Sequence, residues 1–170
     1  MQSTCDAIDS SLKYKRILKP SSVLVYQVER EGQLYVLKIS VDRWDRRHLQ
    51  NEQKILSHCE EIEGVTHLIQ CYQQKDGYPK ALLKEYAEGE MAHRCFDRST
   101  VFSSLEKTVQ ELHGRGIAGL ELEPRNVIVL KQMETKIVDL GKARIYQNIM
   151  CRSFRDRVEG DLYDLENWFT

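Results

Sequence analysis

Asn126 and Asp139 are two residues whose side-chain oxygens could bind a cation, and they lie thirteen residues apart. Between them, residues 127–130 and 135–138 form two short, mainly apolar runs separated by a polar segment. This pattern predicts a β-hairpin, which would bring the amide and the carboxylate to the same end. Such oxygens could hold a divalent cation against phosphate groups, a central requirement of phosphoryl transfer.

Asp139 also begins the triplet Asp139-Leu140-Gly141. Considered alone, this triplet is typical of a plain β-turn, because Asp and Gly are ordinary turn residues. Its position directly after the second hairpin strand, and thirteen residues past Asn126, favours a functional role instead.

Lys38 and Glu52 form a second candidate pair. Lys38 lies near the end of an apolar, strand-like run, and Glu52 lies in the helix predicted next along the chain. A lysine in such a position needs a counter-ion, and Glu52 can provide one, so we expect an ion pair. In the alternative, Lys38 extends from the strand end towards solvent and Glu52 faces water.

The first half of the chain has the pattern of a small α+β lobe. Apolar or alternating runs separated by turns predict five antiparallel strands, and apolar residues recurring every three to four positions predict one amphipathic helix after the third strand. The predicted strands cover residues 12–18, 23–28, 34–39, 66–73 and 80–86, and the predicted helix covers residues 43–61.

Residues 85–90 interrupt both periodicities and are the expected connector to a second lobe. A helix is predicted over residues 100–113 from the spacing of its apolar side chains. Ser99 or Thr100 is its expected N-cap, and Gly114 is expected at its end.

Beyond the hairpin the apolar periodicity weakens. Residues 142–160 are expected to be irregular, and the last helix is expected to begin at Asp161. Its carboxylates would then lie at the N-terminal end of the helix, where the helix dipole favours negative charge.

From about residue 12 to residue 170, these segments together resemble the protein kinase superfamily. Lys38 stands where kinases have the lysine that binds the α- and β-phosphates of ATP, and Glu52 stands where its glutamate partner lies. Asn126 and Asp139 stand where kinases have their two Mg²⁺ ligands. The resemblance therefore implies ATP and Mg²⁺ as cofactors, bound by these four residues.

The connector resembles a kinase hinge, in which the backbone N–H and C=O groups of Glu85 and Ala87 would meet the edge of adenine. Any connector offers free backbone groups, so other interpretations stay open. Lys84 departs from the family pattern, since kinases usually carry an apolar or hydroxyl residue there, at the back of the nucleotide pocket.

Glu121 stands in the position of the catalytic aspartate. Kinases place His-Arg-Asp or His-Gly-Asp before a Leu-x-Pro-x-Asn stretch, whereas this chain has Gly119-Leu120-Glu121 before residues 122–126. The glutamate is one methylene longer, and a general base must come within hydrogen-bond reach of its proton. Glu121 could therefore support slow transfer, or it could be a carboxylate kept for structure after activity was lost.

Typical kinase features are also missing. The turn at residues 19–24 has no glycine to close over a nucleotide, although Ser21 and Ser22 could donate hydrogen bonds to phosphate. Only 31 residues follow Asp139, and no Ala-Pro-Glu motif occurs among them. With this short end, residues 124–129 and 161–166 resemble small atypical kinase-like proteins: the kinase subunit of the KEOPS tRNA-modification assembly, and short fungal kinase-like and aminoglycoside-phosphotransferase-like proteins. In such proteins the aspartate of the final helix, here Asp161, ties the catalytic loop down by hydrogen bonds.

Composition narrows the classes of partner. The formal net charge is −1, so no basic surface indicates direct nucleic-acid or membrane binding. No apolar run approaches the ~18 residues of a membrane span, and the first residues do not match a signal peptide. Five scattered cysteines without a CxxC motif predict free thiols and an intracellular, cytoplasmic or nuclear protein. A zinc site is not favoured, because the ligand spacing of the nearest candidates is irregular: His58, Cys59, His67 and Cys71.

The expected architecture is one bilobal kinase-like domain over residues 1–170, of class α+β. Residues 12–84 would form an N-lobe with a five-stranded antiparallel sheet and one helix. Residues 85–90 would form the hinge, and residues 91–170 a truncated, mainly helical C-lobe, with the nucleotide cleft between the lobes.

Two functions agree with these observations. In the first, an atypical kinase binds Mg·ATP and transfers phosphate slowly to an acceptor hydroxyl, Ser or Thr in a protein substrate, with Lys38, Glu121 and Asn126 as catalytic residues. In the second, the protein is an inactive pseudokinase that acts as a scaffold for an unidentified protein partner. We expect an impaired kinase that still binds nucleotide.

Overall fold

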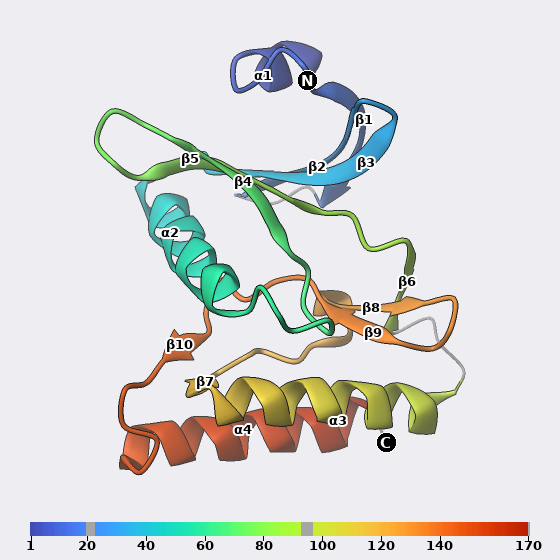
Figure 1. The fold of residues 1–170 in the computed structure, drawn as a ribbon, viewed down its shortest axis with the longest axis vertical. Coiled ribbons are helices and arrows are strands. Elements are labelled where there is room, and N and C mark those ends of the chain that lie inside the picture. Colours follow the sequence, from blue (N-terminus) through green and yellow to red (C-terminus); the bar gives the residue numbers. More distant parts are fainter. Residues whose placement is uncertain (20–22, 93–96, 170) are drawn as a thin grey trace. The chain divides into compact units, whose positions relative to one another are not determined.

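The computed structural model describes residues 1–19, 23–92 and 97–169, without the side chains of Arg43 and Trp44. The protein is α+β, with a five-stranded antiparallel sheet and, in the described ranges, four α-helices and two smaller sheets (Figure 1). It divides into two compact units: Met1–Gln53 with His67–Tyr86, and Lys54–Thr66 with Ala87–Thr170.

The five-stranded sheet belongs to the first unit. Its strands, in spatial order, are β1 (Lys13–Lys19), β2 (Leu24–Arg30), β3 (Gln33–Ile39), β5 (Pro79–Glu85) and β4 (Leu68–Gln73). Each strand predicted from the sequence is confirmed to within two residues at either end. β5 lies between two neighbours and is largely buried, which explains the continuous apolar run at residues 81–83.

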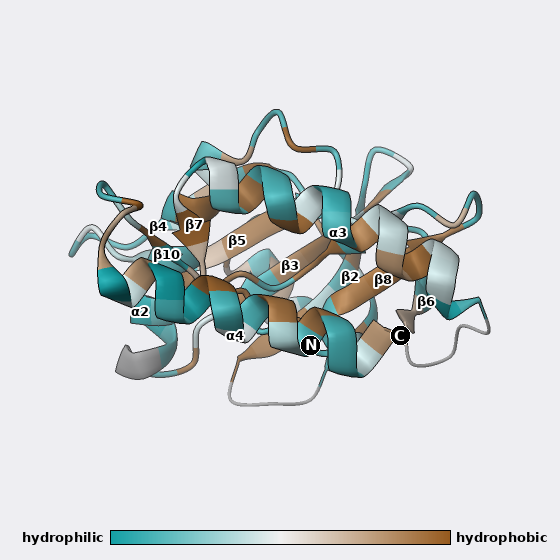
Figure 2. Cartoon of the chain, turned by 90° about the horizontal axis from the view of Figure 1, so that it is seen from below, coloured by the Kyte–Doolittle hydropathy of each residue, from teal (hydrophilic) through white to brown (hydrophobic). Residues whose placement is uncertain are grey.

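One face of this sheet packs against the N-terminal segment. The apolar core there consists of Cys5, Leu12, Tyr26, Val28, Leu37, Ile39, Ala81 and Leu83. Cys5 belongs to α1 (Gln2–Asp6), a helix too short for its periodicity to be recognised in the sequence. The Gln2 side chain fixes the segment, because it donates to the Leu12 carbonyl at 3.0 Å and accepts from the Tyr14 N–H at 2.8 Å. Figure 2 shows the hydrophobic colouring along β3 and β5.

Helix α2 (Arg43–His58) begins where the sequence predicts. The Asp42 carboxylate accepts from the Asp45 N–H at 2.9 Å, and the Asp45 carboxylate accepts from the Asp42 N–H at 3.4 Å, which is a reciprocal N-terminal cap. The buried positions then recur every three or four residues, at Asp45, Leu49, Glu52 and Leu56. Glu52 therefore lies on the buried face of the helix. The helix ends three residues before the predicted end at residue 61, because the Cys59 N–H bonds to the Leu56 carbonyl in a tighter turn.

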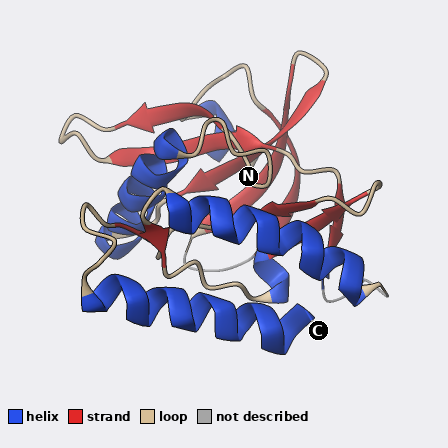
Figure 3. Ribbon diagram, turned by 60° about the horizontal axis from the view of Figure 1, so that its bottom comes forward, coloured by secondary structure: helices blue, strands red, loops and turns tan. Residues whose placement is uncertain are grey.

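The second unit contains two helices that lie side by side, α3 (Arg98–Gly114) and α4 (Arg152–Phe169) (Figures 1 and 3). Its strands form two small sheets: β6 (Gly89–Met91) with β8 (Val127–Leu130) and β9 (Thr135–Ile137), and β7 (Ile117–Ala118) with β10 (Arg144–Ile145). The predicted hairpin is thus confirmed, with its second strand one residue shorter than expected. A 3₁₀ turn, η2 (Pro124–Asn126), leads into β8.

The connector predicted at residues 85–90 runs into strand β6. Gly89 pairs with Leu130, and a Cβ at Gly89 would lie 2.1 Å from the Val129 carbonyl oxygen. Only glycine permits this close approach of two backbones. The connector is therefore shorter than predicted.

Helix α4 corrects two sequence-based predictions. It begins at Arg152 instead of Asp161, so residues 152–160 are helical and not irregular. Gly160, the last residue of the segment expected to be irregular, is exposed within the helix, where a glycine costs only about 1 kcal/mol relative to alanine. Asp161 consequently lies in the middle of the helix, where the N-terminal dipole cannot stabilise it.

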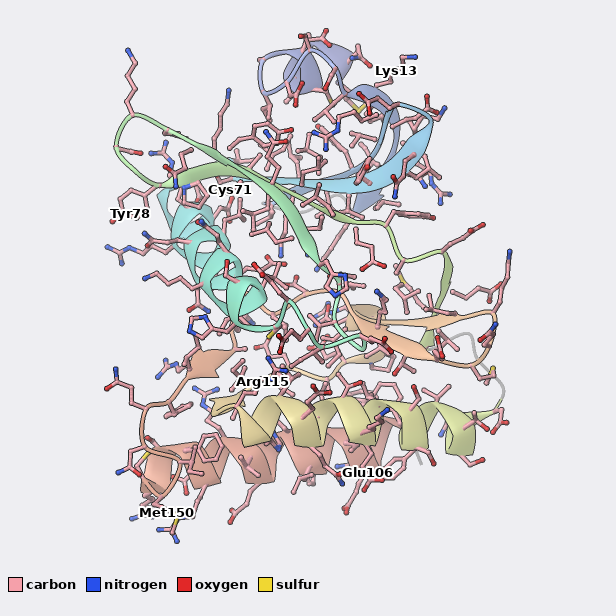
Figure 4. All side chains as sticks on the ribbon, viewed as in Figure 1. Lys13, Cys71, Tyr78, Glu106, Arg115 and Met150 are labelled. Atoms are coloured by element: carbon pink, nitrogen blue, oxygen red, sulfur yellow. The ribbon has the colours of Figure 1, made fainter. Side chains whose placement is uncertain are left out.

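Helix α3 starts earlier than predicted, and its N-cap is Asp97, not Ser99 or Thr100. The Asp97 carboxylate accepts from the Thr100 N–H at 3.2 Å, and the hydroxyls of Ser99 and Thr100 donate to the same carboxylate. At the other end, Arg115, labelled in Figure 4, donates to the His58 carbonyl at 3.3 Å. None of the helices in the described ranges has the length and apolar composition needed to cross a membrane.

Candidate functional site

Glu52 is the centre of a buried charge cluster in the first unit. Glu52 is 0% exposed, Lys38 is 6% exposed and Lys84 is 3% exposed. Lys38 Nζ lies 2.7 Å from Glu52 Oε2, and Lys84 Nζ lies 2.5 Å from Glu52 Oε1. The predicted Lys38–Glu52 ion pair is therefore confirmed, and Lys84 is a second partner that the prediction did not include.

The strand register explains why both lysines reach one carboxylate. Lys38 in β3 is opposite Leu82, and Lys84 in β5 is opposite Val36. Because side chains alternate along a strand, Val36 and Lys38 share a face, and Lys84 lies on that face as well. This is the face opposite to the apolar core, and the two ion pairs connect it to α2.

Glu85, at the end of β5, is engaged within the same unit. Its N–H donates to the His67 carbonyl at 2.9 Å, and its carboxylate accepts from the His67 N–H at 3.2 Å. The Glu85 N–H is thus hydrogen-bonded to His67, whereas the sequence-based prediction has it donating to the edge of adenine. Ala87 is the first residue of the longer segment of the second unit and is 9% exposed; its part in nucleotide binding stays a prediction.

In the second unit, Asp161 fixes the loop that leads to Asn126. Asp161 Oδ1 accepts from the Leu120 N–H at 2.7 Å; Oδ2 accepts from the Gly119 N–H at 2.8 Å and lies 2.9 Å from His113 Nε2. The carboxylate is buried, and the predicted tie between Asp161 and this loop is confirmed. Gly119 has φ +78°, a conformation that glycine adopts without strain.

Glu121 follows directly and has φ +51°, which is uncommon for a residue with a side chain. Its Oε1 lies 2.7 Å from Lys142 Nζ, with both side chains more than a third exposed. Its carbonyl accepts from Asn126 Nδ2 at 3.1 Å. The candidate base therefore has a lysine beside its carboxylate, and its backbone orients the Asn126 amide.

Asn126 and Asp139 flank the open end of the hairpin, as the sequence predicts. Val127 pairs with Ile137, and the Val138 N–H donates to the Asn126 carbonyl at 2.9 Å. Asp139 Oδ1 accepts from the Gly141 N–H at 3.1 Å, so the Asp-Leu-Gly triplet does form a local turn. This turn does not exclude metal binding, because a carboxylate oxygen that accepts one N–H keeps further acceptor capacity.

Two oxygen-bearing side chains are a small ligand set for a metal. Within residues 1–19, 23–92 and 97–169, no group of three or more His, Cys, Asp or Glu residues is arranged to hold an ion. Mg²⁺, however, is commonly bound by one or two carboxylates together with waters and substrate phosphates. A pair such as Asn126 and Asp139 would therefore be sufficient only for a metal ion that is also bound by water and phosphate oxygens.

The cysteines of the described ranges are free thiols: Cys5, Cys59, Cys71 and Cys151. Burial raises the pKa of Cys59 to about 11, which keeps it protonated and unreactive at neutral pH. Ser21 and Ser22, the candidate phosphate donors, lie outside the described residues.

Sequence reasoning missed two charged partners, Lys84 and Lys142. Lys84 had the same signal as Lys38, a lysine within an apolar strand that needs a counter-ion, but only the strand register shows that both reach Glu52. Lys142 is exposed and lies just after Gly141, and nothing in its spacing connects it to Glu121.

Comparisons with known proteins identify no family. No protein-family model matches the chain, and no curated protein matches it significantly.

Proposed function

We propose that this chain is an atypical kinase-like protein that binds Mg·ATP and transfers the γ-phosphate slowly. Lys38, paired with Glu52, would bind the α- and β-phosphates, and Asn126 and Asp139 would bind Mg²⁺. The observation that carries the proposal is the buried Lys38–Glu52 ion pair. A buried ion pair is a poor means of gaining stability, and charged groups in desolvated surroundings are enriched at functional sites.

Two features of the fold support a bilobal kinase-like assignment, with the five-stranded sheet in the N-lobe, the connector between β5 and β6 as hinge, and residues 91–170 in the C-lobe. The first is the five-stranded antiparallel sheet with a helix inserted after its third strand. The second is the grip of Asp161 on the loop before Asn126. We also propose that the chain resembles the small atypical kinases named above and that it acts inside the cell, in the cytoplasm or the nucleus.

Nucleotide binding is tested by thermal unfolding with ATP, with and without Mg²⁺. At a hundredfold excess over the dissociation constant, a ligand stabilises the folded state by about 2.7 kcal/mol, and weaker saturation gives less. Asp139→Asn is expected to abolish the Mg²⁺-dependent part of this stabilisation, because it removes the only carboxylate of the ligand pair.

Asp156→Asn is the matched control, since Asp156 is an exposed carboxylate on α4. It should retain the full Mg²⁺-dependent shift. If Asp139→Asn shows the same shift as the wild type, Asp139 has no role in metal binding; if the wild type shows no shift with ATP at all, the nucleotide proposal is wrong.

A pseudokinase scaffold is the second candidate function, and the geometry of Glu121 favours it. The Glu121 carboxylate already pairs with Lys142. The Glu121 backbone has a positive φ, which few residues other than glycine adopt. Lys142 contacts one oxygen of this carboxylate, so the other oxygen would have to reach the hydroxyl of an acceptor.

Glu121→Asp separates the two functions. Aspartate tolerates the left-handed conformation better than most residues, and its side chain is one methylene shorter, as in the catalytic residue of the kinases that the chain resembles. If Glu121 is a misplaced base, the variant should raise radiolabel transfer from ATP while nucleotide affinity stays nearly unchanged. Glu121→Ala should lower transfer. Absence of transfer in all three proteins, together with an intact fold, would favour the scaffold.

A further inference from the structure

We propose that Lys84 is a positioning residue of the nucleotide site. Lys84 holds and neutralises Glu52, an arrangement called the clamp below. Lys38 can then pair with a phosphate while Glu52 keeps a cationic partner. The pairing of Lys38 with a phosphate rests on the proposed function, whereas the contact between Lys84 and Glu52 does not.

The geometry assigns one ammonium group to each oxygen of the carboxylate. Lys84 Nζ lies 2.5 Å from Oε1, and Lys38 Nζ lies 2.7 Å from Oε2. Both lysines come from neighbouring strands of one sheet and are more than nine-tenths buried, and Glu52 has no exposed surface. Two strands of one sheet thus hold the carboxylate through both of its oxygens.

The contact of each lysine with its own oxygen of Glu52 affects the free-energy cost of ligand binding. A fully buried carboxylate that loses its last cation is strongly destabilised, so a single lysine could turn towards a phosphate only at a large cost. With Lys84 on Oε1, Lys38 can turn away from Oε2 while Glu52 stays paired. Lys84 therefore lowers the cost of phosphate binding by Lys38 without touching the nucleotide.

The clamp is tested first without nucleotide, by thermal unfolding of Lys38→Met, Lys84→Met and the double variant. Each single variant is expected to lower the midpoint modestly, because the remaining lysine keeps Glu52 paired. The double variant should lower it by clearly more than the sum, since it leaves a buried unpaired carboxylate. Additive effects would overturn the clamp.

Should the double variant fail to fold, the triple variant with Glu52→Met decides. It contains no charge in this cluster, and replacing a buried ion cluster by apolar residues is often neutral or stabilising. A folded triple variant supports the clamp, and an unfolded one overturns it.

The positioning role is tested by the Mg·ATP dissociation constant. Lys84→Met is expected to weaken binding about tenfold, or about 1.4 kcal/mol, and Lys84→Arg to restore it by supplying a cation to Glu52. Lys80→Met is the control, since Lys80 lies on the same strand and donates to the Ala7 carbonyl; its affinity should equal that of the wild type.

Equal affinity of Lys84→Met and wild type would overturn the positioning role and leave the proposed function intact. A wild-type protein that binds no Mg·ATP would overturn both, and the unfolding experiments would still decide whether Lys84 clamps Glu52.

Discussion

Replacing Glu52 by alanine is expected to lower the free energy of unfolding by about 3–5 kcal/mol, the usual cost of removing one partner from a buried ion pair. The expected loss is large because two buried ammonium groups, those of Lys38 and Lys84, lose the carboxylate that both contact. Small domains have a total stability of about 5–15 kcal/mol, so the change should be obvious in a urea titration followed by circular dichroism.

Glu61→Ala is the control for removing a glutamate as such. The Glu61 side chain is 85% exposed and makes only a long ion pair with Arg115, so no measurable change is expected. A loss below about 1 kcal/mol for Glu52→Ala would contradict the prediction. It would mean that both lysines reach solvent once the carboxylate is gone, and that the cluster is not buried in solution.

The regular parts of the fold could be predicted because local patterns and tertiary burial agree there. The strands of the first unit alternate with turns that contain Gly32 and Gly77, both with positive φ. Helix α2 has its reciprocal cap at Asp42 and Asp45 and a buried face spaced every three to four residues. Where the local sequence pattern and the tertiary burial agree, the periodicity of apolar residues is sufficient to predict the helix or strand.

The errors occur where local signals conflict with packing. The sequence favours an irregular segment up to Gly160, but the buried face formed by Phe154, Asp161 and Leu165 continues the helix through it. The connector at residues 85–90 looked irregular, and Gly89 in fact allows strand pairing. In both cases contacts far along the chain decide the conformation, and no window of the sequence contains them.

The candidate site was predictable to a similar extent. Lys38 with Glu52, and Asn126 near Asp139, follow from residue types at the ends of predicted elements. The additional cations, Lys84 and Lys142, reach their partners through strand register and through the left-handed backbone at Glu121. Neither contact leaves a signal in residue spacing, because each joins residues that are far apart in the sequence.

Asp161→Ala is expected to have the largest effect in the second unit. It removes the acceptor for two buried N–H groups, those of Gly119 and Leu120, and the partner of His113. Leaving a buried donor unsatisfied costs about 1–3 kcal/mol, so the two donors together give a loss of about 2–6 kcal/mol in urea unfolding. Asp161→Asn retains one acceptor oxygen and should lose about half as much.

Asp164→Asn, one turn further along α4, is the matched control and should have the opposite sign. Desolvation raises the pKa of Asp164, and the negative charges of Asp161, Glu123 and Glu121 raise it further. A raised pKa in the folded state means that ionised Asp164 destabilises the protein at neutral pH, and that this penalty disappears below the ordinary value of 3.8, where the carboxyl is protonated in both states. Asp164→Asn should therefore leave stability unchanged or slightly higher at pH 7 and have no effect in acid. Equal losses for the Asp161 and Asp164 variants would show that helix α4 is sensitive to any substitution on this face, and that the grip of Asp161 on the loop contributes nothing specific.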